Sequence, residues 1–420
     1  MPCFGMKIVL ITQRLKMDII LEKINKFKIN KKLLHQYSKS KCNKIVSIVY
    51  FGRSGSQFLY GLLESHPNFL SIKSEFRAYW SNKYNSPAGA NIKDQLFNFL
   101  ELYATLNKKG EHQMVRVNGT NLDIHIPKDF IFSERDNKIK NERKFPNIYK
   151  FIRYFLELSS IRYKSKKKLN NKEFFDTVFL SYSMCICKPA QKEFIILYNH
   201  HVPDKYEINT IEKNYLKTTI IHTIRHPIQT FVSHIKRYLE PKGRFNGIQD
   251  KNIVSHCLSG LFKDDQQLKS RDNSVEYAIK LEDLHKNLKL ELNKIFKNLN
   301  IKFDNSCLKE TFDGSFTPGI TGFDGKHIKN TRKQKDLYNF TRYLSNKDIM
   351  QFQKIFRENY HKWNYKFLEE TEEKDNRSKK IFDFVSEIEE KHNFEIDDQQ
   401  ILDLIFKKAS TKNNIFELLK

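Results

Sequence analysis

The segment SIVYFGRSGSQFLYGLLESHP, residues 47–67, constrains the fold more than any other part of the chain. The run at residues 45–51 is apolar and rich in β-branched side chains, which is typical of a strand buried on both faces of a parallel sheet. Helical spacing begins near Ser56 and ends before Pro67. A tight glycine-containing loop between such a strand and helix presents backbone N–H groups and the positive helix end to an anion. The segment therefore predicts a phosphate-binding loop.

The side chains of this loop supply further donors. Arg53 carries a planar guanidinium that can bridge two oxygens of an anionic group, and Ser54 and Ser56 add hydroxyls. A plain glycine turn with an exposed arginine is the alternative. The loop lacks the G-x-x-x-x-G-K-[ST] pattern of nucleoside triphosphatases, because Gln57 and Phe58 stand where its lysine would be. No later strand visibly ends in an aspartate for Mg²⁺, so the loop is P-loop-like without the parts of a nucleoside triphosphatase.

Strand and helix patterns then alternate along the chain. Apolar runs at residues 193–204, 218–224 and 275–284 are each followed by a helical pattern. Pro227 suits the first position of the helix after the second run. These repeated units predict an α/β protein, a P-loop-like fold with a mainly parallel central sheet flanked by helices. Ligands of such sheets bind at the carboxyl ends of the strands.

Composition divides the chain into three parts. Residues 1–43 form a basic N-terminal extension, residues 44–370 carry the strand and helix units, and residues 371–420 form a C-terminal helical extension that begins in a polar linker. The stretch at 107–172 is less regular and ends in RYKSKKKLNNK, with six basic side chains in eleven residues. We interpret this basic run first as a solvated insertion and second as the rim of a site for an acidic substrate.

The charge balance favours anionic partners. The 420 residues include 74 Lys and Arg against 49 Asp and Glu, a net charge of +25. A bias towards Lys, Asn and Ile throughout the chain accounts for part of this excess. The six cysteines form no disulfide framework, which fits a reducing compartment. The apolar run MKIVLI is too short for a signal sequence or a membrane span, so we expect a cytoplasmic protein.

Two motifs together resemble the sulfotransferases that use 3′-phosphoadenosine 5′-phosphosulfate (PAPS). The first family signature is a strand, a [KR]-S-G-[ST] loop and a helix, and YFGRSGSQFLYGLL fits it. The second is a strand ending in R-x-P with a serine eight residues beyond the arginine, and TIRHPIQTFVSHI supplies Arg225, Pro227 and Ser233. AIKLEDL is similar to the family's E-D-L strand end. The resemblance covers roughly residues 44–367 and implies transfer of a sulfuryl group from PAPS to an acceptor hydroxyl, with no metal.

The resemblance also implies roles for individual residues. Arg225 and Ser233 would hold the 3′-phosphate of the donor, and Arg53 would steady the sulfuryl and leaving-group oxygens. Phe58 falls where the family often stacks an aromatic ring near the adenine, although a core aromatic at helical spacing is an equal alternative. Hydroxyls and backbone amides of the loop residues Ser54, Gly55, Ser56 and Gln57 would hold the 5′ end.

Two residues are candidates for the base that takes the proton of the acceptor hydroxyl. Glu75, in HPNFLSIKSEFRAYW, lies where the carbohydrate and tyrosylprotein branches of the family place a carboxylate, with an exposed loop carboxylate as the alternative. His201, in NHHVP, resembles the histidine of the cytosolic branch, but Asn199 stands where that branch has a lysine. Trp80, five residues beyond Glu75, favours a carbohydrate acceptor on a glycan or glycolipid.

Two other classes of function are compatible with the sequence. A nucleotide kinase or triphosphatase would bind ATP with Mg²⁺, whereas a noncatalytic basic module would bind polyanions with strong salt dependence. As partner, a glycan or another hydroxyl acceptor is favoured over nucleic acid, and peripheral contact with a membrane is compatible with the charge. The sequence does not indicate an oligomeric state.

Overall fold

The computed structural model describes the chain between residues 24 and 367, with gaps. The predicted C-terminal extension, residues 371–420, lies outside the described residues. Within the described ranges, no helix combines the length and apolarity needed to cross a lipid bilayer. These ranges are 24–25, 27–50, 54–72, 79–80, 89–103, 115–117, 120–122, 148–201, 205–239, 274–312, 315–316, 349–350, 352–353 and 356–367.

A five-stranded sheet forms the centre of the molecule. Its strands are β1 (Lys41–Tyr50), β2 (Phe69–Ser71), β5 (Glu193–His201), β6 (Lys217–Ile224) and β7 (Ser274–Lys280). The helices are α2 (Lys31–Ser38), α3 (Ser56–Leu63), α4 (Ile92–Tyr103), α5 (Ile148–Arg162), α6 (Asn171–Cys185), α7 (Lys205–Asn214), α8 (Pro227–Leu239), α10 (Leu281–Lys286), α11 (Leu288–Leu299), the 3-10 helix η2 (Asn305–Leu308) and α13 (Arg357–Lys362). Two small hairpins pair β3 (Val115–Val117) with β4 (Thr120–Leu122) and β8 (Thr311–Phe312) with β9 (Ser315–Phe316).

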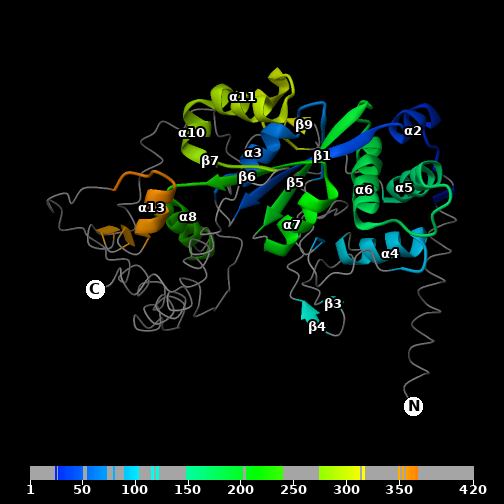
Figure 1. The fold of residues 1–420 in the computed structure, drawn as a ribbon, viewed down its shortest axis with the longest axis horizontal. Helices are drawn as coiled ribbons and strands as arrows, with labels where there is room; N and C mark the ends of the chain where they lie inside the picture. Colours follow the sequence, from blue (N-terminus) through cyan, green and yellow to red (C-terminus); the bar gives the residue numbers. More distant parts are fainter. Residues whose placement is uncertain are drawn as a thin grey trace, which may run out of the picture.

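The strands of the central sheet run in the order β2-β5-β1-β6-β7, and every neighbouring pair is parallel (Figure 1). The prediction of an α/β protein with a parallel sheet flanked by helices is confirmed. From β1 the chain passes to β2 and β5 on one side, and then crosses to β6 and β7 on the other. This change of direction places the carboxyl end of β1 at the switch point of the sheet, where α/β proteins bind ligands.

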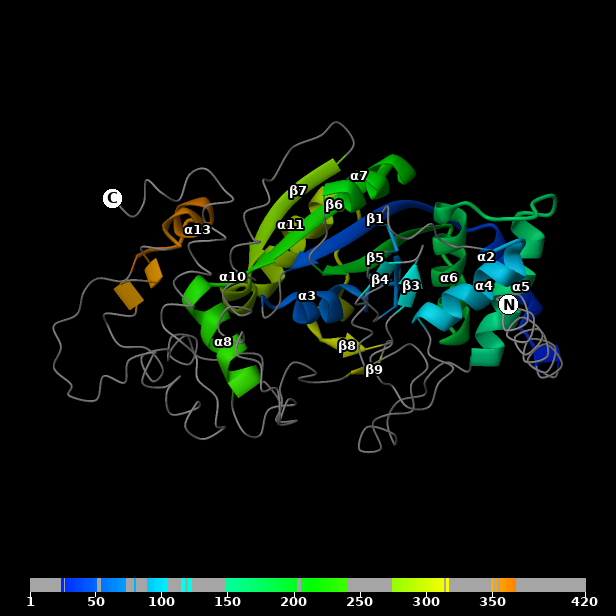
Figure 2. The same cartoon turned by 90° about the horizontal axis from the view of Figure 1, so that it is seen from below.

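Helices pack on both faces of the sheet. α3 and α11 cover the face that carries Val46, Ile48 and Ile221, and their buried leucines share one apolar cluster with these residues. A second, aromatic-rich cluster joins α2, α4, α5 and α6 to β1 and β5. Figure 2 shows α8 and α10 at one end of the sheet and these four helices gathered at the other. Burial of each large apolar side chain contributes about 1.5–3 kcal/mol, so both helical layers are firmly held.

The helix after the predicted phosphate loop begins at Ser56, as the sequence predicts. Leu59, Leu62 and Leu63 are fully buried at i, i+3 and i+4, which fixes the face that α3 turns to the sheet. The preceding strand begins at Lys41, four residues earlier than the apolar run suggests. The reason is a tertiary contact: Lys41, Cys42 and Lys44 pair with the first residues of β5, with a register shift between Cys42 and Lys44. Polar side chains there do not prevent this backbone pairing.

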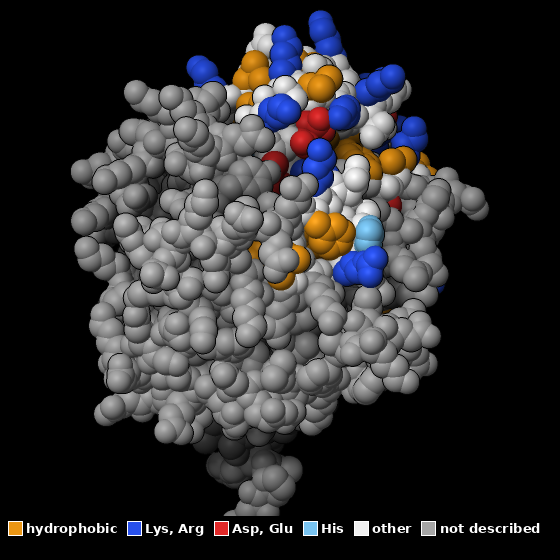
Figure 3. All heavy atoms as spheres, turned by 90° about the vertical axis from the view of Figure 1, so that its left-hand side faces the viewer, with side chains coloured by type: hydrophobic (Ala, Val, Ile, Leu, Met, Phe, Trp, Pro, Cys, Tyr) orange, Lys and Arg blue, Asp and Glu red, His pale blue; other side chains and the backbone are white. Residues whose placement is uncertain are grey.

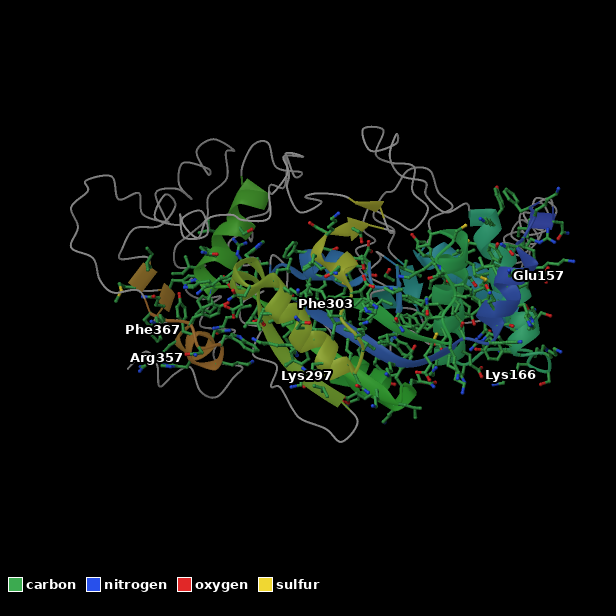
Figure 4. The ribbon with its side chains drawn as sticks, turned by 90° about the horizontal axis from the view of Figure 1, so that it is seen from above. Glu157, Lys166, Lys297, Phe303, Arg357 and Phe367 are labelled. Atoms are coloured by element: carbon green, nitrogen blue, oxygen red, sulfur yellow. The ribbon has the colours of Figure 1, made fainter. Side chains whose placement is uncertain are left out.

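The stretch that the sequence predicts to be irregular contains α5. Nη1 of Arg162, at the end of α5, donates to the carbonyl of Ser40 at 2.7 Å, next to the first residue of β1. The basic run therefore lies at the amino end of β1, and a ten-residue strand is about 30 Å long. Figure 4 shows Lys166 at the opposite end of the molecule from Arg357. The exposed lysines of this run face solvent, as the first interpretation, a solvated insertion, predicts, and the run lies away from the strands' carboxyl ends.

Candidate functional site

The loop after β1 is hydrogen-bonded to the neighbouring strand. Oγ of Ser54 lies 2.8 Å from Oγ1 of Thr223, near the carboxyl end of β6. The Thr223 hydroxyl also lies 3.5 Å from the carbonyl oxygen of Val49. Both hydroxyl-bearing residues are buried. The Ser54 hydroxyl, which the sequence suggests as a ligand contact, thus has a partner within the protein and ties the loop to β6.

Gly55 turns the chain from this loop into α3. Its φ of +89° is in the left-handed region, and a Cβ at this position would lie 2.5 Å from Cδ1 of Leu281. Side chains other than glycine are strained there, and the first residue of α10 already fills the space. Leu281 follows directly after β7, so the end of a third strand packs against the loop.

The first turn of α3 has the properties of an anion site. Within the described chain, no side chain caps the helix end at Gly55. The unbonded N–H groups of the first turn and the positive helix end are therefore available to an anion. Ser56 is buried at the first helical position, and the buried Oε1 of Gln57 has no hydrogen-bond partner among the described residues. An anion can accept hydrogen bonds from these N–H groups and from the Ser56 hydroxyl, whereas Oε1 of Gln57 needs a donor. The ligand contacts of Ser56 and Gln57 stay predictions.

A second helix begins at the end of the adjacent strand. α8 starts at Pro227, as predicted, two residues after Arg225. Arg225 is half-buried, and its Nε donates to Oε1 of Gln229 at 3.3 Å. Ser233 is also half-buried and lies one turn beyond Gln229. The two predicted nucleotide segments, about 170 residues apart in sequence, therefore lie at the carboxyl ends of adjacent parallel strands.

Glu282 links this junction to the C-terminal part of the domain, a contact that the sequence alone did not reveal. Its Oε1 accepts the backbone N–H of His226 at 2.9 Å, and its Oε2 accepts the hydroxyl of Tyr365 at 3.1 Å. Lys280 donates to the carbonyl of Asn364 at 3.0 Å. Glu282 lies in the first turn of α10 rather than at the end of the strand, because β7 ends at Lys280. The E-D-L motif, which contains Glu282, was the sequence feature that could have pointed to this residue.

His226 is a neutral, buried histidine beside this anion site. Its ring lies 5.3 Å from that of Tyr360 and 5.1 Å from that of Tyr365, both in edge contact. Burial, together with the positive charges of Arg225 and Lys280, lowers the pKa of His226 to about 4. The imidazole is therefore uncharged near neutral pH, and the positive charge next to the start of α8 comes from Arg225.

The third strand end, that of β5, is held by a buried histidine. His200 is paired in register with Val49 of β1, its Nδ1 lies 3.3 Å from Oγ of Ser47, and its Nε2 lies 3.2 Å from Oε2 of Glu207 on α7. These contacts join the end of β5 to β1 on one side and to α7 on the other. His201 is the last residue of β5, and its side chain lies outside the described residues.

Asn199 lies two residues before His201, at the position where the resemblance leads one to expect a lysine. It is 2% exposed, and its Oδ1 has no hydrogen-bond partner within the described chain. A lysine ammonium at this buried position would need a bound anion or a carboxylate to compensate its desolvation, whereas the neutral amide needs neither. The structure therefore explains why an amide is tolerated here but gives no independent support for His201 as base.

The aromatic residues that the sequence singled out have partners inside the protein. The ring of Phe58 stacks on that of His285 with centroids 4.9 Å apart, and Phe58 packs against the α3 and α11 cluster. Because His285 covers one face of the Phe58 ring, this contact favours the interpretation of Phe58 as a core residue. Trp80 is 1% exposed and lies against Phe175 and Tyr215. A buried indole cannot stack on a sugar, so Trp80 does not support a carbohydrate acceptor.

Two of the predicted catalytic residues, Arg53 and Glu75, lie outside the described residues, and the structure does not place them. No group of three or more His, Cys, Asp or Glu side chains that could bind a metal occurs in the described part of the chain. On the α13 side of the molecule, the described surface carries several Lys and Arg side chains among apolar and uncharged ones, with few acidic side chains (Figure 3).

The fold defines a class of protein: an α/β protein with a parallel sheet, whose switch point carries a candidate anion site. Two helix N-termini, those of α3 and α8, begin at adjacent strand ends, and Arg225 adds a fixed positive charge. Backbone amides, hydroxyls and a guanidinium are the donor set of a phosphate or sulfate site. Such a site can hold an anionic group without a metal.

Solved structures that match this chain include two sulfotransferase domains of low similarity. No family model matches the sequence, and no curated protein matches it. The first structure is titled "Sulfotransferase Domain from the Curacin Biosynthetic Pathway", with 13% sequence identity, a TM-score of 0.35, and coverage of 85% of this chain and 100% of that chain. The second, "Sulfotransferase Domain from the Synechococcus PCC 7002 Olefin Synthase", has 13% identity, a TM-score of 0.35, and coverage of 64% and 78%.

Proposed function

We propose that this chain is a PAPS-dependent sulfotransferase. One observation supports this function more than any other: the loop after β1 and the Arg225 segment, each with the spacing of a sulfotransferase signature, meet at adjacent strand ends. The Ser54–Thr223 hydrogen bond joins the first segment to the strand that carries the second. A nucleotide with phosphates at both its 3′ and 5′ positions needs two such anion sites on one edge of a sheet.

The residues of the site suit the two ends of that nucleotide. The amides of the first α3 turn and the Ser56 hydroxyl would hold the 5′ end, while Arg225 and Ser233 would hold the 3′-phosphate. PAPS, when bound, supplies the sulfuryl group. During transfer a bond forms between the acceptor oxygen and sulfur, the bond between sulfur and the 5′-phosphate oxygen breaks, and the acceptor proton passes to a base. Positioning and charge stabilisation by fixed donors are the expected contributions of this chain, with Arg53 proposed to face the transferred group.

The acceptor is proposed to be a hydroxyl of a glycan or glycolipid. The support for this class is the resemblance of HPNFLSIKSEFRAYW to carbohydrate sulfotransferases, since Trp80 no longer contributes. Incubation with labelled PAPS and a panel of glycans, small alcohols and tyrosine peptides tests it. Transfer to peptides or small alcohols alone would assign a different acceptor while leaving the donor unchanged.

The donor is tested by ligand stabilisation, because a ligand that binds the native state raises its stability. We expect 3′-phosphoadenosine 5′-phosphate (PAP) to raise the melting temperature without metal, and more than ATP with Mg²⁺ does. Arg225→Ala and Ser233→Ala should weaken PAP far more than adenosine 5′-phosphate, by about tenfold or more for Arg225, since hydrogen bonds to charged groups contribute about 1.5–3 kcal/mol.

The matched control is Lys297→Ala, which removes one exposed positive charge from α11 (Figure 4). It should leave both affinities within about twofold, because exposed charges act weakly through solvent. Stronger stabilisation by ATP with Mg²⁺ would point to a kinase or triphosphatase. Binding of many polyanions with steep salt dependence and no nucleotide preference would point to a noncatalytic module.

A further inference from the structure

Gln229 lies between the two residues proposed to hold the 3′-phosphate. It is four residues after Arg225 and four before Ser233, and a spacing of four places Gln229 and Ser233 on the same side of α8. Gln229 is the third residue of the helix, so it belongs to the turn whose N–H groups face the helix start. It is 3% exposed, which is unusual for a glutamine without a role in packing or binding.

The orientation of its carboxamide follows from the chemistry of its neighbour. A guanidinium has only donors, so the group that faces Nε of Arg225 at 3.3 Å must be the amide oxygen. The amide nitrogen is then the free end of the side chain. This Nε2 is buried and has no hydrogen-bond partner among the residues that the structure describes. A buried donor without an acceptor is costly, and most such groups in native proteins have a partner.

We propose that Gln229 is a third contact of the 3′-phosphate: its Oε1 orients Arg225, and its Nε2 donates a hydrogen bond to the phosphate. This inference rests on the proposed function and extends it to a position within the second signature segment that the R-x-P and serine pattern leaves unspecified. Three features agree on an anionic acceptor: a positive helix end, an arginine in contact with the same carboxamide, and an unsatisfied donor. A donor-only cation at this place would leave Nε2 without an acceptor, whereas an anion supplies one and also pairs with Arg225.

Two substitutions separate the two ends of the carboxamide. Gln229→Glu keeps an oxygen for Arg225 but replaces the donor by a negative charge. Gln229→Leu removes both ends at similar volume. We expect Gln229→Glu to weaken PAP by well over tenfold and Gln229→Leu by about tenfold, while adenosine 5′-phosphate, which lacks the 3′-phosphate, changes by less than about threefold. The measurement is titration calorimetry with both nucleotides on the full chain.

The control is Gln95→Leu on α4. Gln95 is equally buried, and its amide exchanges two hydrogen bonds with the backbone of Leu169 in the helical end of the molecule. Gln95→Leu should lower the stability of the protein and leave the ratio of the PAP affinity to the adenosine 5′-phosphate affinity unchanged. That result would show that a loss of stability alone does not alter this ratio.

Three other outcomes would each contradict one or both of the two proposals, the function of the chain and the role of Gln229. If the unsubstituted protein does not prefer PAP over adenosine 5′-phosphate, both the proposed function and the role of Gln229 are wrong. If it prefers PAP and both Gln229 variants keep that preference, only the role of Gln229 is wrong. If Gln229→Glu keeps the preference and Gln229→Leu loses it, Gln229 acts only by orienting Arg225, and the direct contact is excluded.

Discussion

The hydroxyls of Ser54 and Thr223 lie 2.8 Å apart in the interior and join the loop after β1 to the end of β6. In a parallel sheet the main-chain hydrogen bonds fix the strands but leave the loops beyond them free. This contact ties the loop after β1 to the neighbouring strand β6. The two segments proposed to bind the phosphates are therefore held by the same pair of strands.

Thr223→Val removes the hydroxyl at nearly constant volume. We expect a loss of about 1 kcal/mol in the free energy of unfolding and a several-fold weaker affinity for PAP, because the loop loses its link to β6. Urea unfolding and calorimetry measure the two effects. Thr177→Val in α6, also fully buried and bonded to a carbonyl, is the control and should affect stability alone. Unchanged PAP affinity in Thr223→Val would show that the link does not support the site.

Gly55→Ala should destabilise the protein by about 1–3 kcal/mol, because alanine is strained at φ +89° and its Cβ would contact Leu281. The measurement is chemical unfolding. Adding Leu281→Ala removes the contact but not the backbone strain, so the double variant should recover only the steric part of the Gly55 effect. Full additivity of the two single effects would mean that the residues do not interact in solution.

Glu282→Ala should cost about 1–3 kcal/mol, since it removes the acceptor of the His226 N–H and of the Tyr365 hydroxyl. Tyr365→Phe should cost about 1 kcal/mol. In a double-mutant cycle the two changes should be less than additive, because both break the same bond. Tyr37→Phe, which removes a hydroxyl bonded to the carbonyl of Lys188 at the other end of the molecule, should add independently to Glu282→Ala.

Stability should fall as the pH is lowered through the range of His226. Its pKa is about 4 in the folded protein against 6.5 ordinarily, so the unfolded chain binds the extra proton between these values. Stability from this group is complete above about pH 6.5 and decreases towards pH 4, with a loss of about 2 kcal/mol between pH 7 and pH 5. Urea unfolding at several pH values should show a shallower dependence in His226→Gln. An equal dependence in both proteins would contradict a buried neutral imidazole.

The identity of the base is tested by Glu75→Gln, which keeps the shape of the side chain and removes its basicity. If Glu75 is the base, turnover should fall by about 10² to 10⁴ with PAP affinity nearly unchanged. Initial rates with a glycan acceptor and calorimetry with PAP measure the two quantities. Near-normal turnover in Glu75→Gln, with loss of turnover in His201→Ala at intact PAP affinity, would assign the role to His201.

The sequence by itself determined the local structure around the candidate site. The buried run before Gly52, the apolar spacing from Ser56 and the proline at position 227 predicted a strand, a loop and two helix starts, and the structure has the strand and both helix starts. Such features depend on a few neighbouring residues, because strand burial, glycine conformation and helix initiation are properties of short segments.

Only the tertiary structure decided which of these segments meet. The Ser54–Thr223 bond, the packing of Leu281 against Gly55 and the bridge from His226 through Glu282 to Tyr365 join residues from separate strands and helices. Spacing along the chain does not specify such pairs, since strand order decides which strand ends are adjacent. The same holds for Trp80, whose place in the sequence favoured a carbohydrate acceptor and whose side chain is buried in the core by tertiary packing.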